Sequence, residues 1–185
     1  MIEKRPLPIY LHDIVDAARA ARDSPAGLSA FRGDLHTQCL RHWPEDVVKQ
    51  WLYDHADHPA FLADYGHIDL TRVAWRLESV PLEMLVTMTT GASENDLIDY
   101  FAEEPEHWVK VRSQGCHVGV REMWELHGTW KSWPVLLDQG LIDPQLEGLQ
   151  VVEGRTRVGI LRGRFRRGLH VAPKHLAWIG HPISE

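Results

Sequence analysis

Apolar residues recur at helical spacing through roughly the first seventy residues of the chain. Leu11, Ile14 and Ala18 share one face of a helical projection, and this period is typical of an amphipathic helix packed on a core. Asp, Pro and Gly residues interrupt the period at intervals, as they do where helices end. We therefore predict three helices: the first ends at residues 23–27, the second covers 28–42, and the third runs from Pro44 to the Asp-His-Pro segment at 57–59.

The pattern changes after about residue 70, where short apolar runs bounded by Gly and Pro become frequent. Runs of this length are typical of strands in a small buried sheet. Pro173 interrupts the last run, which favours an edge strand because proline cannot donate to a ladder. The predicted strands cover residues 73–80, 133–137, 149–152 and 171–179, and the predicted helices cover 93–104 (with Ser93 as the cap), 105–112 and 155–166, whereas 115–128 stays ambiguous.

These elements predict an α+β fold in which an N-terminal helical region, residues 1–71, packs on a small mixed-sheet domain, residues 72–185. The chain is 44% hydrophobic and 25% charged, which suffices for a core and excludes wholesale disorder. No apolar run approaches the roughly 20 residues that cross a bilayer, and the first residues do not look like a secretory leader. Two cysteines make no disulfide framework. We expect a cytoplasmic protein with no membrane partner.

The net charge of −6 hides an uneven distribution. Residues 153–185 contain seven Lys and Arg against two acids, so this stretch is basic and the rest of the chain is strongly acidic. Such asymmetry favours an anionic ligand near the basic stretch. DNA binding is less favoured, because the overall charge is negative and no aromatic residues alternate with the arginines as single-strand binding prefers.

The basic stretch begins at a segment whose chemistry suits an anion. A predicted buried strand runs into Gly154, and an arginine-rich helix follows. The first N–H groups and the dipole of a helix favour a negative charge. Arg155 and Arg157 add forked donors, and Thr156 adds a hydroxyl. Glu153 lies where a carboxylate could hold a metal or take a proton. The segment therefore predicts a phosphate or carboxylate site.

This segment resembles the signature of the ParB/sulfiredoxin superfamily, in which a strand and an acidic or similar residue precede Gly-x-x-Arg at the start of a helix. The matching residues are Glu153, Gly154 and Arg157. The segments 76–82 and 133–138 resemble the family's first strand and the strand before its signature, so the resemblance covers roughly residues 72–182. The chain departs from the pattern at Thr156, where the family most often has Arg or His.

The resemblance implies a nucleotide, ATP or CTP, whose phosphates lie against Gly154, Arg155, Thr156 and Arg157. It also implies phosphoryl or nucleotidyl transfer or NTP hydrolysis, assisted by Mg²⁺ and by Glu153. Glu78, near the end of the first predicted strand, is the candidate second carboxylate. The alternative is a non-catalytic module that keeps this fold as a scaffold and binds a protein partner through its acidic or basic surface.

Other constellations have plainer explanations. Gly115-Cys116-His117 resembles a sulfiredoxin loop, but Val118 replaces the arginine that would follow, so an ordinary cysteine is favoured. His36, Cys39 and His42 do not share one helical face, and no second pair stands at zinc-finger spacing, so no metal site is predicted. Aromatic residues of the helical region are expected to form its core rather than a ligand cage: Trp51, Tyr53, Phe61, Tyr65 and Trp75.

Overall fold

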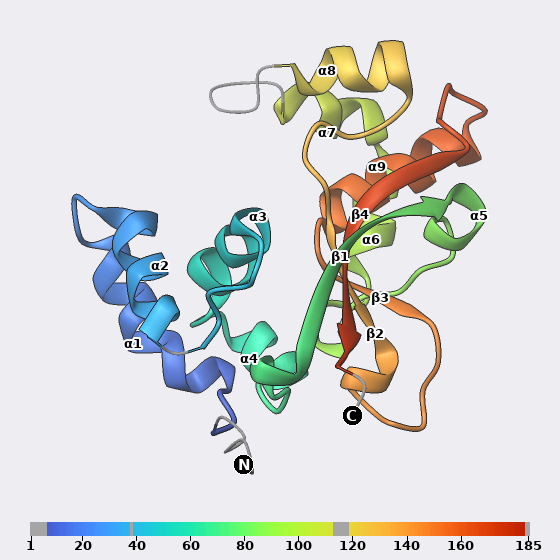
Figure 1. The fold of residues 1–185 in the computed structure, drawn as a ribbon. Coiled ribbons are helices and arrows are strands. Elements are labelled where there is room, and N and C mark those ends of the chain that lie inside the picture. The colour runs from blue at the N-terminus through green and yellow to red at the C-terminus, as the bar shows by residue number, and fades with distance from the viewer. Residues whose placement is uncertain (1–6, 38, 113–118, 184–185) are drawn as a thin grey trace. The chain divides into compact units, whose positions relative to one another are not determined.

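A computed structural model describes residues 7–37, 39–112 and 119–183 and has an α+β fold with one four-stranded mixed sheet (Figure 1). The chain forms two compact units, each built from several segments. The first unit comprises segments 1–76, 138–148 and 180–185, and the second comprises 77–137 and 149–179. No helix among the described residues is long and apolar enough to cross a membrane.

The sheet has the strand order β1-β4-β2-β3. β4 is therefore an interior strand, and the expectation of an edge strand at the C-terminal end is wrong. Pro173 precedes β4 and Pro182 is its last residue, so both prolines lie outside the middle of the strand, where every residue keeps its N–H for the ladder. The strands are β1 (Val73–Pro81), β2 (Val135–Asp138), β3 (Leu149–Glu153) and β4 (Lys174–Pro182).

Short helices around an aromatic core make up the first unit. Trp51, Phe61 and Tyr65 are fully buried there, so these three confirm the predicted aromatic core. The second helix ends at Thr37 instead of residue 42, and Cys39 adopts a left-handed φ of 66° that a right-handed helix cannot continue through. The helices are α1 (Leu11–Arg22), α2 (Gly27–Thr37), α3 (Glu45–Val47) continued by a π-helical segment (Val48–Tyr53), and α4 (Pro59–Tyr65).

Gly33 gives the first testable prediction, because it lies within α2 and a β-carbon there would meet no atom within 4 Å. Glycine in a helix interior costs about 0.5–1 kcal/mol relative to alanine. We expect Gly33→Ala to stabilise the protein by that amount, which thermal unfolding measures as a rise of about 1–4 °C. A lowered melting temperature would contradict the open surroundings of Gly33.

The second unit places helices beside the sheet (Figure 1). Its core includes Leu136 and Val151 from the strands and Val158 and Leu161 from α9. Ser93 is not a helix cap, because it lies inside a separate 3₁₀ turn (Ala92–Glu94), and the next helix begins at Leu97. The helices are α5 (Leu82–Leu85), α6 (Leu97–Glu103), α7 (Pro105–Val111), α8 (Val120–Glu122) continued by a π-helical segment (Met123–His127), and α9 (Arg155–Arg166).

Helix α9 packs on α6 through two glycines. A β-carbon on Gly159 would lie 2.4 Å from the β-carbon of Phe101, and one on Gly163 would lie 2.3 Å from the carbonyl oxygen of Ala102. Real β-carbons are not found this close to other atoms, so the backbones of the two helices meet directly. This close contact fixes α9, and with it the junction between β3 and α9.

Candidate functional site

The predicted phosphate segment forms a tight junction between β3 and α9. β3 ends at Glu153 and α9 begins at Arg155, with Gly154 between them in a left-handed conformation (φ 104°, ψ 17°). Glycine adopts this conformation without strain, and a β-carbon at this position would lie 2.5 Å from that of Pro134. The position therefore demands glycine for its backbone and for its packing.

The N-terminus of α9 has no side-chain cap, and the first turn of the helix contains no acidic residue. A helix N-terminus has N–H groups without intrahelical partners and a partial positive charge. The local geometry is thus of the kind that receives an anion.

Arg157 joins this junction to the segment that precedes β2. Its Nη1 donates to the carbonyl oxygens of Ser132, at 3.0 Å, and Trp133, at 3.2 Å. Its Nη2 forms an ion pair with Glu153, one turn before it in the sequence. Both side chains of this pair are about one-fifth exposed, so the pair lies partly open to solvent.

Arg155 has a carboxylate partner that the sequence does not indicate. Its guanidinium forms an ion pair with Glu94, whose side chain is 20% exposed. Glu94 lies in the 3₁₀ turn (Ala92–Glu94) before α6 and is 61 residues away in the chain. No local spacing could reveal this pairing, because the fold alone brings the turn to the N-terminus of α9. Thr156, between the two arginines, is partly buried.

Glu78 is not brought to this junction. It lies on β1, and β4 and β2 separate β1 from β3 in the sheet. Three steps between neighbouring strands amount to about 14 Å. The structure therefore gathers Glu153, Gly154, Arg155, Thr156 and Arg157 with Glu94, and it leaves Glu78 on the opposite edge strand.

The described residues contain no group of three or more His, Cys, Asp or Glu side chains that could hold a metal ion. Cys39 is an exposed free cysteine. Cys116 and the other residues of its predicted loop lie outside the described residues, as does the side chain of His36. The carboxylates of Glu94 and Glu153 form ion pairs with Arg155 and Arg157 in this structure.

The arginines later in α9 are not all solvated. Arg162 and Arg164 are only 7% and 5% exposed, so these two side chains do not belong to a solvated basic face. Arg162 donates to the carbonyl oxygen of Met88, at 2.6 Å, and pairs with Asp99. The segment of α9 contains no acid, a pattern that could have indicated partners on other elements.

Arg164 and Arg166 also pair with carboxylates of neighbouring helices, namely those of Glu106 and Asp99. Burial disfavours the charged form of Asp99, but hydrogen bonds and the charges of Arg162 and Arg166 outweigh it and lower the pKa of this carboxyl. These charges are therefore satisfied within the second unit, which does not favour a nucleic-acid surface on α9.

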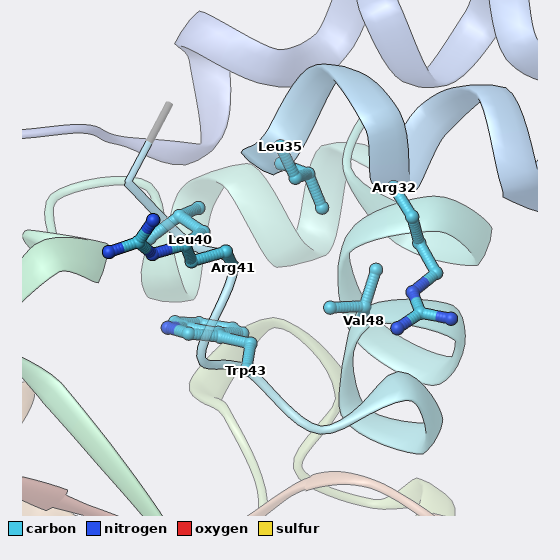
Figure 2. A pocket seen from close by; sticks show the side chains of 6 residues that line it. All are labelled: Arg32, Leu35, Leu40, Arg41, Trp43 and Val48. Atoms are coloured by element: carbon cyan, nitrogen blue, oxygen red, sulfur yellow. The ribbon is translucent and has the colours of Figure 1, made fainter. Parts of the chain in front are cut away.

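A hollow that the sequence does not predict lies among the helices of the first unit (Figure 2). It is a shallow depression that opens to solvent and encloses no space large enough for a water molecule. Two arginines and a tryptophan line it together with aliphatic side chains. The lining residues are Arg32, Leu35, Leu40, Arg41, Trp43 and Val48.

No family model matches this chain, and comparison with curated proteins and with solved structures gives no significant match. The resemblance to the ParB/sulfiredoxin superfamily thus depends on the residues quoted above.

Proposed function

We propose that the junction of residues 153–157 binds the phosphate groups of a nucleotide, ATP or CTP, as in ParB-like proteins. The observation that carries the proposal is the N-terminus of α9, which follows a left-handed Gly154 and has neither a capping side chain nor an acid in its first turn. Backbone N–H groups and the helix dipole attract phosphate at such a position. Arg155 and Arg157 flank it on the first turn of the helix.

Binding requires an exchange of partners at the two arginines. In the free protein, Glu153 pairs with Arg157 and Glu94 with Arg155. A phosphate group offers more negative charge and several acceptor oxygens, so it can replace either carboxylate. Glu153, once released, would hold a magnesium ion or orient an acceptor. Phosphoryl transfer depends mainly on positioning and charge stabilisation, so phosphoryl or nucleotidyl transfer or NTP hydrolysis could follow.

The nucleotide proposal predicts a stabilisation by one triphosphate. We expect ATP or CTP at about 100 times its dissociation constant to stabilise the protein by about 2.7 kcal/mol, or by about 5–10 °C in melting temperature. Arg157→Ala should abolish this shift. In the absence of Mg²⁺, Glu153→Gln should tighten binding, because it removes the carboxylate that competes for Arg157.

The matched control is Arg166→Gln, since Arg166 is an exposed arginine of the same helix with an exposed partner. This variant should retain the nucleotide shift. Absence of a shift with ATP, CTP, GTP and UTP, with and without Mg²⁺, would contradict the proposal. An equal shift in the wild type and in Arg157→Ala would place the nucleotide elsewhere.

A non-catalytic interaction module is the second candidate. It is supported by the internal carboxylate partners of Arg155 and Arg157, which already satisfy both cations. On this hypothesis the two ion pairs are structural and hold β3, α9 and the turn of Glu94 together. The wild type would then bind no nucleotide, and Arg157→Ala would lower the melting temperature and leave the interaction with a protein partner unchanged.

A further inference from the structure

The outer side of β1 is an open sheet edge. The strand is nine residues long and has one neighbour in the sheet, β4 (Figure 1). Arg76, Leu77 and Ser79 in its middle are exposed, and the strand contains no proline or lysine before its last residue, Pro81. An open edge of this length is a template for a further strand, so the edge favours pairing with one.

Two backbone hydrogen bonds show which groups of β1 point outward. The N–H of Leu82, directly after the strand, donates to the carbonyl oxygen of Pro173 at 3.0 Å. That of Ile183 donates to the carbonyl oxygen of Arg72 at 2.9 Å, so β1 and β4 are antiparallel and the even-numbered residues of β1 bond to β4. The odd-numbered residues therefore direct their N–H and C=O groups away from the sheet. Between 75 and 79, these outward groups have no hydrogen bond to any described residue.

The charges of β1 match those of a second copy of the strand in one register. Arg76 and Glu78 lie two residues apart and hence on one face. When two copies pair antiparallel about Leu77, each Arg76 lies opposite Glu78 of the other copy, at a non-hydrogen-bonded position where side chains are closest. Pairing about residue 76 or 78 would instead place like charges opposite each other. The charge pattern thus selects a single self-complementary register.

The other face of β1 adds an apolar contact in that register. Leu77 is 37% exposed and lies across from Trp178 of β4. Leu176, on the same face of β4 as Trp178, is 42% exposed. Pairing about Leu77 brings the two copies of this side chain together at the two-fold axis, so the apolar stripe of one sheet continues into the other.

We propose that β1 pairs with β1 of a second copy of this chain, antiparallel and centred on Leu77, and so joins two four-stranded sheets into one. The pairing would form about six backbone hydrogen bonds and an ion pair on each side of the two-fold axis. Such an interface is small, so we expect a reversible dimer with a dissociation constant of about 10–100 µM. The inference is independent of the nucleotide proposal, because β1 and β3 are opposite edges of the sheet.

The test combines sedimentation equilibrium of the full chain, from about 1 µM to about 1 mM, with amide hydrogen exchange at both ends of this range. We expect the mass to rise from one chain toward two. Exchange at Leu77 and Ser79 should slow several-fold at the higher concentration, whereas the amides of Arg76 and Glu78, which bond to β4, should be protected throughout. A chain that stays monomeric, or a dimer in which Leu77 and Ser79 gain no protection, would overturn the proposal.

Charge-reversed variants test the register. Arg76→Glu alone and Glu78→Arg alone should each weaken dimerisation at least about tenfold, because each places like charges opposite each other. An equimolar mixture of the two variants should form mixed dimers, and the double variant should dimerise as the wild type does. The control is Arg112→Glu, the same change at an exposed arginine that ends α7, which should leave dimerisation intact. A mixture that associates no better than its components would overturn the register.

Discussion

Replacing Gly163 by alanine is expected to destabilise the protein by about 3 kcal/mol, or to lower its melting temperature by about 6–12 °C. The added β-carbon would lie 2.3 Å from the carbonyl oxygen of Ala102 and 3.0 Å from its carbonyl carbon. Both atoms belong to the backbone of α6, so the clash can be relieved only if a whole helix shifts. Since the core of the second unit includes Ile98 from α6 and Val158 from α9, such a shift disturbs packing on both sides.

Chemical denaturation and calorimetry of Gly163→Ala would measure this loss. Gly33→Ala is the matched control, because it makes the same chemical change within a helix where no atom lies near. Gly163→Ala should therefore lower the free energy of unfolding, and Gly33→Ala should raise it. A Gly163→Ala variant as stable as the wild type would show that α6 and α9 do not meet as closely as described here.

Acid is expected to destabilise the protein through His175. This side chain is 2% exposed, and burial lowers its pKa to about 4, although a hydrogen bond to the backbone of Ala172 partly opposes the shift. Nε2 donates to the carbonyl oxygen of Ala172 at 2.8 Å, and Nδ1 accepts from the Thr129 hydroxyl at 2.8 Å. Both contacts suit a neutral ring, and protonation would place a second N–H against Thr129.

The pH dependence follows from the lowered pKa. The unfolded chain takes up the His175 proton near pH 6.5, whereas the folded protein takes it up only near pH 4. The contribution of His175 is therefore complete above pH 6.5 and is lost as the pH falls toward 4. The total loss is about 3 kcal/mol.

The measurement is the free energy of unfolding between pH 4 and pH 7. His175→Asn cannot titrate, so it should be less stable than the wild type at pH 7 and should lose less stability on acidification. His170→Asn is the control, because His170 is exposed, and its pH dependence should follow that of the wild type. Parallel curves for the wild type and His175→Asn would contradict the role assigned to His175.

Local patterns predicted most elements of the fold. The α+β class is confirmed, and so are the helix over 155–166 and the strand that begins at Val73. These elements follow from spacing, proline and glycine within a few residues. The second helix extends less far than predicted because Cys39 adopts a positive φ. Cysteine rarely adopts this conformation, so the sequence does not indicate it.

Contacts between distant segments could not be predicted in this way. The interior position of β4 depends on which strands it joins, and Pro173 alone suggested an edge. The burial of Arg162 depends on Met88 and Asp99, which lie more than sixty residues earlier. Glu94 reaches Arg155 for the same reason. The predicted ligand of the junction stays a prediction until nucleotides are tested.

The pairing of α9 also bears on the order in which this chain can fold. α9 contains five arginines and no acid, so an isolated helix of this sequence repels itself and is marginal at twelve residues. Its neutralising partners Glu94, Asp99 and Glu106 precede it in the sequence and leave the ribosome first. The acidic partners are thus already available when the arginines emerge, and α9 gains its stability by docking on them after a long loop closes.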